Sequence, residues 1–302
     1  MGEDMRVALA TWFGDDLELL VKILAGEVQS ARELTRLVSD RQRKASFHLE
    51  FTDGRQFKAR RYRTAAAISS AVALSPLLAA LPFSRVLGNR GLVALEQWIE
   101  GTPLSPAAVS AEQARVAGAL LGRVHCSADL PADLLAQVPA GNWYADNIGA
   151  HLQELVAAGA LTASVAASLH QAASANRPGR LDSGLVHGDF CADNIVVDGT
   201  GGLFVVDNES LQLAALDYDL ARCWARWPMS QSQRNAFAEG YRGFRGLGEF
   251  AAHATFWAIQ ALSQSIAVHL RHNKPCEAAL AALRQLGREP GAARWPELSA
   301  LP

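Results

Sequence analysis

LVHGDFCADNIVVD, residues 185–198, is followed closely by LFVVDNES, residues 203–210. The first stretch has the spacing H-x-D-x-x-x-x-N, with Asp189 and Asn194 in the last two positions, and the second places Asp207 after an apolar run. Phosphoryl transfer needs one carboxylate to take or orient the acceptor proton, and an Asn and a second Asp to hold magnesium against ATP phosphates. Because both stretches occur in this order, each beside a β-branched run, they predict a phosphoryl-transfer site.

The segments around this motif indicate two lobes. Helical periodicity dominates from Pro106 onward, apart from a glycine-containing hairpin near residues 195–207. The N-terminal part predicts a helix stopped by Gly26 and then strands at 33–39, 46–52 and 55–62, an Ala-rich helix, and strands at 85–87 and 91–95. We therefore expect an α+β, bilobal fold, with an N-terminal lobe over residues 1–96 (leading helix and antiparallel sheet), a linker over 97–104, and a mainly helical lobe over 105–302 that contains the motif. The family resemblance described below implies that this fold is protein-kinase-like and that the helical lobe holds the catalytic loop and metal-binding segment.

Composition excludes several classes of protein. The chain has 302 residues and a formal net charge of −2, which argues against a nucleic-acid binder. No apolar stretch is long enough for a spanning helix, and the four cysteines are scattered without metal-ligand spacing. These features predict a cytoplasmic protein with reduced thiols and no nucleic-acid or membrane partner. They do not indicate an oligomeric state.

The motifs resemble those of the aminoglycoside phosphotransferase and choline kinase group of protein-kinase-like enzymes. HGDFCADN resembles the catalytic loop of that group, VVDNES its metal-binding segment, and LDYDLAR, residues 216–222, the segment that usually follows. ALEQWIEGTPL is similar to its interlobe linker, and GALLGRVH to the helix before its insert. The resemblance runs in order from Leu34 to Ala225 and is most specific over residues 185–222.

The resemblance implies roles for individual residues. Asp189 would be the catalytic base or acceptor-orienting carboxylate, and Asn194 and Asp207 would bind Mg²⁺. His187 and Asp219 would support the catalytic loop. In the linker, the main-chain carbonyl of Gln97 and N–H of Ile99 would hold the adenine of ATP.

The phosphate-binding part of the N-terminal lobe departs from the family pattern. The expected covering turn, residues 38–47, has no glycine and offers Arg41, Arg43 and Lys44, which would either neutralise phosphate or form a solvated basic turn. Arg60 occupies the position of the usual nucleotide-binding lysine, with Lys58 as the fallback on the same strand face. No Glu lies between Tyr62 and Leu95, so the helical carboxylate that would pair this cation is absent.

These observations predict an ATP- and magnesium-dependent kinase that phosphorylates a hydroxyl of a small metabolite, sugar or antibiotic-like molecule. The alternative is a pseudokinase or nucleotide-binding regulator, favoured by the glycine-free turn and the missing Glu. A protein kinase is disfavoured because the segment after Asp207 is too short for a long activation loop. Glu209, Trp224 and Trp227 are candidate substrate residues; the aromatic rings would suit a cationic ligand, although Trp at helical spacing is also typical of a core.

Overall fold

The computed structural model describes residues 2–39, 42–126 and 141–288. The chain divides into two compact units, here called the sheet unit, Met1–Pro103 with Ile195–Gln212, and the helical unit, Leu104–Asn194 with Leu213–Pro302. The antiparallel sheet and the helical region agree with the predicted fold class. The hairpin after Asn194 belongs to the sheet unit, although the sequence placed it with the helical part.

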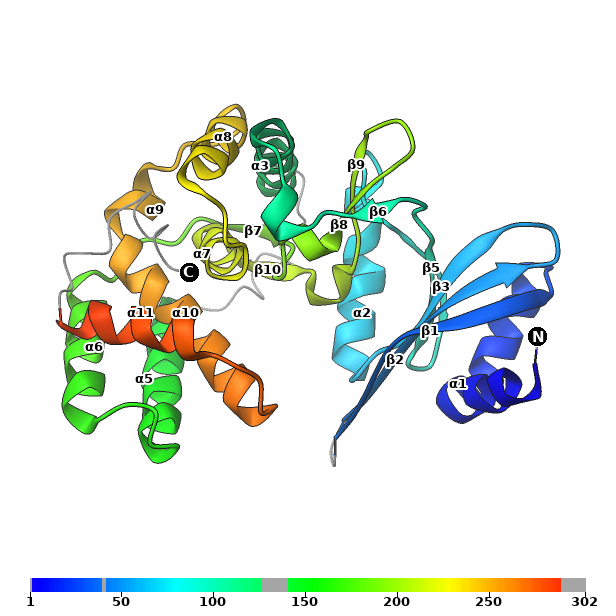
Figure 1. The fold of residues 1–302 in the computed structure, drawn as a ribbon, viewed down its shortest axis with the longest axis horizontal. Coiled ribbons are helices and arrows are strands. Elements are labelled where there is room, and N and C mark those ends of the chain that lie inside the picture. Colours follow the sequence, from blue (N-terminus) through cyan, green and yellow to red (C-terminus); the bar gives the residue numbers. More distant parts are fainter. Residues whose placement is uncertain (1, 40–41, 127–140, 289–302) are drawn as a thin grey trace. The chain divides into compact units, whose positions relative to one another are not determined.

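A five-stranded antiparallel sheet in the order β1-β2-β3-β5-β4 organises the sheet unit (Figure 1). A second sheet, in the order β6-β8-β9, joins the linker to the hairpin. The helices and strands of the unit are α1 (Glu3–Ile23), β1 (Val28–Ser39), β2 (Gln42–Phe51), β3 (Gln56–Arg61), α2 (Ala65–Leu74), β4 (Val86–Arg90), β5 (Val93–Gln97), β6 (Thr102–Pro103), β8 (Ile195–Val197) and β9 (Leu203–Val205), with 3-10 turns at Ser75–Leu78 and Asn208–Ser210.

The two faces of the five-stranded sheet differ in chemistry. One face is apolar and packs against α1, through residues such as Phe47 and Leu95 on the sheet and Trp12 on the helix. The opposite face carries Arg60 and Lys58, because alternate strand residues point to opposite sides. Helix α2 packs on this second face through Ile68 and other apolar residues, against Tyr62 and Ala94. The apolar face therefore holds the unit together, and the polar face is available for a site.

The end of α1 follows a different geometry from the one predicted. The helix ends at Ile23, and the left-handed residue after it is Ala25 (φ 49°), not Gly26. A Cβ atom on Gly26 would lie 2.1 Å from the ring of Phe51. Gly26 is therefore required by a close approach to β2 and not by its backbone angle.

The helical unit is built from packed helices and one two-stranded sheet, β10-β7. Helices α3 and α8 approach closely, because a Cβ on Gly118 would lie 2.0 Å from the Phe237 carbonyl oxygen and one on Gly240 would lie 1.9 Å from that of Arg115. The helices and strands of the unit are α3 (Ala111–His125), α5 (Gly141–Ala157), α6 (Ala163–Ala175), β7 (Ser183–Val186), β10 (Gln212–Ala215), α7 (Leu216–Arg226), α8 (Gln231–Arg242), α9 (Gly248–Ala252), α10 (Ala254–Arg271) and α11 (Glu277–Arg288), with 3-10 turns at Pro106–Ala108 and Ala192–Asn194. In the described ranges we find no helix with the length and apolarity needed to cross a bilayer.

Candidate functional site

The loop after β7 carries Asp189 and is held by the buried carboxylate of Asp219. The backbone N–H groups of His187 and Gly188 donate to Asp219 at 2.7 and 2.8 Å. Gly188 has a φ of 75°, a conformation that favours glycine. The loop is therefore fixed through its main chain, and these are the contacts that the predicted supporting role of Asp219 requires.

A second layer of hydrogen bonds supports Asp219. His125 Nε2 lies 3.2 Å from Asp219 Oδ2, and His125 Nδ1 lies 2.7 Å from the Tyr241 hydroxyl. A neutral imidazole that donates from Nε2 and accepts at Nδ1 satisfies both contacts. Burial acts to raise the pKa of Asp219, but the hydrogen bonds from His125 and from the His187 N–H outweigh it, and the pKa is lowered. Asp219 is therefore an anion at neutral pH.

Asn194 ends the loop and contacts Asp189. Its Nδ2 donates to the Asp189 carbonyl oxygen at 2.8 Å and to Asp189 Oδ2 at 3.2 Å. Because the amide nitrogen is used within the loop, the amide oxygen is the atom that can ligate a cation. The five-residue spacing thus turns the Asn194 side chain back onto Asp189.

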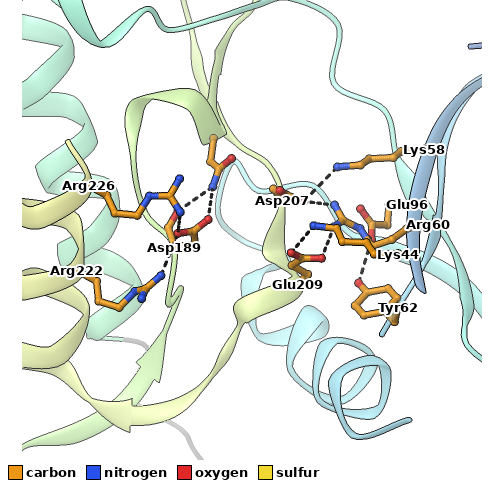
Figure 2. A network of polar contacts seen from close by, with 11 residues as sticks. Lys44, Lys58, Arg60, Tyr62, Glu96, Asp189, Asp207, Glu209, Arg222 and Arg226 are labelled. Atoms are coloured by element: carbon orange, nitrogen blue, oxygen red, sulfur yellow. Dashed lines mark hydrogen bonds and ion pairs between the residues drawn. The ribbon is translucent and has the colours of Figure 1, made fainter. Parts of the chain in front are cut away.

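Two arginines of α7 also contact Asp189. Arg226 Nη1 lies 2.5 Å from Asp189 Oδ1, and Arg222 Nη2 lies 3.3 Å from the same oxygen (Figure 2). The sequence analysis missed both residues. Their spacing of three and seven residues after Asp219 places them on the same helix face as Asp219, which was the one available signal in the sequence.

Cys191 lies in the same loop as Asp189, and its Sγ is 3.8 Å from Nη2 of Arg226 on α7. Burial raises the pKa of the Cys191 thiol to about 11, so the thiol stays protonated at neutral pH. A protonated, buried thiol is a filler of the loop and not a nucleophile.

In the sheet unit, Arg60 is the centre of a cluster of ionic side chains (Figure 2). Its side chain is buried, with 1% exposed, and its three nitrogens each contact a different carboxylate. Nε lies 2.7 Å from Glu96, Nη1 lies 2.8 Å from Glu209, and Nη2 contacts Asp207. Burial acts to lower the pKa of Arg60, but the three carboxylates raise it well above its ordinary value.

The cluster is balanced in charge. Lys44 Nζ lies 2.5 Å from Glu209, and Lys58 Nζ lies 3.3 Å from Asp207 Oδ1. The ion cluster, as we call this set, therefore contains three cations and three carboxylates, namely Lys44, Lys58, Arg60, Glu96, Asp207 and Glu209. In the turn between β1 and β2, Arg41 lies outside the described residues.

Glu96 supplies a carboxylate that the sequence analysis did not assign to Arg60. Helix α2 contains no acidic residue, as expected from the sequence. The carboxylate that contacts Arg60 comes instead from Glu96 on strand β5. Glu96 lies opposite Lys58 in the pairing of β5 with β3, the strand that also carries Arg60. The Tyr62 hydroxyl also donates to Glu96 at 2.9 Å, and burial followed by the negative charge of Glu96 raises the pKa of Tyr62.

Asp207 combines an unusual backbone with a strongly anionic side chain. Its φ of 66° and ψ of 46° place it in the left-handed region, which Asp tolerates better than most residues. Burial acts to raise the pKa of its carboxyl, but the charges of Arg60, Lys58 and Lys44 outweigh it and lower the pKa well below its ordinary value. Arg60 and Lys58 both contact Oδ1, which leaves Oδ2 for another cation.

Each unit offers an oxygen atom of the kind that Mg²⁺ prefers. In the sheet unit this atom is Asp207 Oδ2, and in the helical unit it is the amide oxygen of Asn194. Mg²⁺ is commonly held by one or two carboxylates together with substrate phosphates. In the portion of the chain that the structure describes, no group of three His, Cys, Asp or Glu side chains could hold a metal by itself. Lys58, whose side chain is 16% exposed, and Lys44, at 12%, are the cations near Asp207 with donors to spare for phosphate.

The linker residues predicted to bind adenine lie at the end of β5. The N–H of Gln97 donates to the Arg85 carbonyl oxygen at 2.8 Å. This contact does not involve the carbonyl oxygen of Gln97, which is the atom predicted to bind adenine. Trp98, between Gln97 and Ile99, packs its ring against His48 on β2 with centroids 4.1 Å apart. The adenine contacts of Gln97 and Ile99 stay predictions.

Trp224 and Trp227 are core side chains of the helical unit. They are 6% and 0% exposed, and both rings pack edge-on against Phe237. Neither ring is open to a ligand from solvent in this structure. Of the two interpretations of these tryptophans, cation binding or a place in the core, the structure agrees with the core. Glu209, the third candidate substrate residue, lies in the ion cluster.

A pocket of about 470 Å³ lies between α5 and α6 in the helical unit. Its lining is mostly apolar, with His170 and Gln153 as its polar residues. It contains none of the predicted site residues.

Comparisons with known proteins identify a family for this chain. The profile of APH, the phosphotransferase enzyme family, matches residues 34–253. No curated protein sequence matches the chain.

Solved structures with a similar fold include three phosphotransferases of low sequence identity. The choline kinase LicA from Streptococcus pneumoniae has a TM-score of 0.66 and 13% identity, over 99% of this chain and 100% of that chain. The spectinomycin phosphotransferase APH(9)-Ia, solved with ADP and spectinomycin, has a TM-score of 0.63 and 12% identity, over 93% of each chain. The macrolide 2'-phosphotransferase MphH from Brachybacterium faecium has a TM-score of 0.56 and 21% identity, over 89% of this chain and 98% of that chain. Because the family profile covers most of the sequence, the chain belongs to the APH phosphotransferase enzyme family.

Proposed function

We propose that this phosphotransferase moves the γ-phosphoryl group of ATP, with Mg²⁺, onto a hydroxyl of a small molecule. The observation that carries the proposal is Asp207, an anionic carboxylate with one oxygen left for a cation. The structurally similar enzymes are named for choline, spectinomycin and macrolides, which supports a small organic acceptor for this chain.

Each residue of the motif has a defined task in this proposal. Asp189 accepts the proton of the acceptor hydroxyl, and Asn194 and Asp207 hold the metal. Bound magnesium would neutralise charge on the transferred phosphoryl group. Asp219 keeps the loop main chain in place, so that Asp189 needs no rearrangement before reaction.

The ion cluster changes which cation we assign to the nucleotide. Arg60 is buried and contacts three carboxylates, so we propose that it positions Asp207. Lys58 is more exposed and makes one longer contact, so we assign it the nucleotide phosphates. This reverses the order of preference drawn from the sequence.

The test is ATP-dependent phosphoryl transfer to a panel of amino alcohols, sugars and hydroxy acids. Asp189→Asn should lower kcat by about 10²–10⁴-fold, the range typical of a lost general base. Asp193→Asn is a matched control, because Asp193 is an exposed carboxylate of the same loop and should retain activity. Turnover that survives Asp189→Asn would rule out the proposed role of this carboxylate.

A pseudokinase is the second candidate, favoured by one observation. Asp207 already contacts two cations, and α2 offers no acidic residue to draw Arg60 away. A thermal-shift titration tests nucleotide binding, the first step of the kinase reaction, since a ligand that binds the folded state raises Tm. ATP with Mg²⁺ should raise the Tm of the wild type more than that of Asp207→Asn, and binding without turnover on any acceptor would favour the pseudokinase.

A further inference from the structure

We propose that the acceptor carries an anionic group, a carboxylate or a phosphate, close to the hydroxyl that is phosphorylated, and that Arg222 and Arg226 bind it. This inference rests on the proposed function, because it takes Asp189 as the residue that receives the hydroxyl proton. It names a class of substrate that differs from a cationic acceptor such as choline.

The first observation is the position of the two guanidinium groups. Arg222 and Arg226 are four residues apart on α7, and both contact the same oxygen of Asp189, at 3.3 and 2.5 Å. Residues at this spacing lie on one face of a helix, so the two side chains converge. Any hydroxyl that reaches Asp189 must therefore bring its neighbouring substituents within a few ångströms of two positive charges.

The second observation is that these groups are accessible and that one donor of Arg222 has no partner among the described residues. The side chains of Asp189, Arg222 and Arg226 are 19%, 18% and 39% exposed, so a small molecule can reach them. Arg222 Nε is buried, and no residue in the described part of the chain accepts a hydrogen bond from it. Buried donors normally have a partner, so this one indicates that an acceptor group from a ligand completes the site.

The charge of the site selects against a cationic substituent. Asp189 with Arg222 and Arg226 has a formal charge of +1. Asp193 is the other carboxylate of the loop, and because it is exposed its charge is screened by water. A guanidinium group binds carboxylate and phosphate through paired N–H donors. An anionic substituent is therefore attracted to this position, whereas an ammonium group is repelled.

The aromatic residues agree with this conclusion. A cationic acceptor would be recognised by exposed ring faces, but Trp224 and Trp227 are buried in the core of the helical unit. Among the described residues, the side chains that contact the Asp189 carboxylate are those of Arg222, Arg226 and Asn194.

Binding of the anion would also prepare Asp189 for the reaction. Both arginines contact Oδ1 of Asp189, and an acceptor anion competes for these donors, which frees Oδ1 to accept a proton. The acceptor oxygen then forms a bond to the γ-phosphorus, the bond from that phosphorus to the β–γ bridging oxygen breaks, ADP leaves with the electron pair, and the hydroxyl proton passes to Asp189. The product is a phosphomonoester that still carries the original anion.

The experiment compares acceptors that differ mainly in one group. Glycerate, glycerol 3-phosphate and glycerol are offered to the wild type with ATP and Mg²⁺, and ethanolamine serves as the cationic member. We expect kcat/KM to be at least tenfold higher for one of the two anions than for glycerol, and the better of the two identifies carboxylate or phosphate as the preferred group. A wild type that prefers glycerol or ethanolamine overturns the proposal.

Variants of the arginines test whether they provide the preference. Arg226→Met and Arg222→Met should each lower kcat/KM for the anionic acceptor by about 10–100-fold and for glycerol by less than threefold. Arg242→Met is the control, because Arg242 is exposed on α8 and should change neither value. Equal losses for every acceptor would overturn the proposal, because the arginines would then not distinguish an anionic acceptor from a neutral one.

A binding measurement separates this proposal from the proposed function. Glycerate or inorganic phosphate, without nucleotide, should raise the Tm of the wild type but not that of the Arg222→Met/Arg226→Met double variant. If transfer fails with every acceptor while this difference persists, the kinase proposal is wrong and the anion site stands. If neither anion distinguishes the double variant from the wild type, the anion site is wrong, whatever the enzyme phosphorylates.

Discussion

Asp219 in the helical unit and Arg60 in the sheet unit are both fully buried charges, yet their surroundings differ. Asp219 accepts hydrogen bonds from two backbone N–H groups and an imidazole. Arg60 contacts three carboxylates and belongs to a cluster in which three cations balance three anions. One charge is stabilised by dipoles, and the other by opposite charges.

This difference determines how much a substitution in each region lowers the stability of the protein. Only proline removes a main-chain N–H donor, so the loop around Asp219 keeps two of its contacts under other side-chain substitutions. In the ion cluster every contact depends on a side chain, and removal of one partner leaves another ion buried without compensation. The ion cluster should therefore be the more sensitive region in stability.

The largest effect is expected for Arg60→Met. The substitution leaves Glu96, Asp207 and Glu209 without their common partner, and Glu96 is itself 5% exposed. Loss of one member of a buried ion pair costs about 3–5 kcal/mol, and urea unfolding of the full chain at neutral pH should show a loss of this size.

A double variant provides the control for this prediction. In Arg60→Met/Glu96→Gln the most buried carboxylate is also neutral, so part of the lost stability should return as a coupling energy. If Arg60→Met unfolds at the same urea concentration as the wild type, the cluster contributes nothing to stability and the contrast with Asp219 disappears.

The features that followed from local pattern were predicted, and those that depend on pairing between distant segments were not. Alternation placed Lys58 and Arg60 on one strand face, and the strand register confirms it. Glu96 was missed because its contact with Arg60 depends on the pairing of β3 with β5, which local sequence does not encode.

The residues of the loop were predicted from the sequence, but the arginines around its proposed catalytic residue, Asp189, were not. Asp189 and Asn194 lie within one short motif, so their spacing indicated a common structure, whereas the role of Asp219 was implied by the family resemblance of LDYDLAR. Arg222 and Arg226 lie on the same helix as Asp219, but their direction toward Asp189 depends on how α7 packs beside the loop. Periodicity shows which residues share a helix face and does not show what that face contacts.

Asp219→Asn tests the dipole-stabilised region and should have the second-largest effect. The amide has only one accepting oxygen, so its NH₂ group must face at least one of the donors from His187, Gly188 and His125. We expect a loss of about 2–3 kcal/mol in the free energy of unfolding, together with loss of phosphoryl transfer.

The pH dependence of this loss follows from the lowered pKa of Asp219. The unfolded carboxyl has a pKa of about 4, so the stabilisation is fully present above that pH and is lost as the pH falls toward the lower pKa of the folded state. Urea unfolding should show a constant difference between variant and wild type from pH 8 to pH 5, and a smaller one below pH 4. A difference that grows on acidification would contradict an anionic Asp219.

The smallest effect is expected for Asp217→Asn, two residues before Asp219 on α7. Both carboxylates lie in the first turn of the helix, where its dipole favours anions, so the dipole cannot explain why their pKa values move in opposite directions. Burial raises the pKa of Asp217 to about 6 despite the charge of Arg245. Among the residues that the structure describes, none donates a hydrogen bond to its carboxylate, whereas Asp219 has three such donors.

A raised pKa means that ionised Asp217 destabilises the folded state. The destabilisation develops as the pH rises from about 4, where the unfolded carboxyl ionises, to about 6, and it is constant above that. Asp217→Asn should therefore increase the free energy of unfolding by about 1–3 kcal/mol at pH 8 and have little effect at pH 4, with the exposed Asp193→Asn as a neutral control. A variant less stable than the wild type at pH 8 would mean that attraction to Arg245 outweighs burial, and hydrogen-bond donors would then no longer account for the contrast between the two carboxylates.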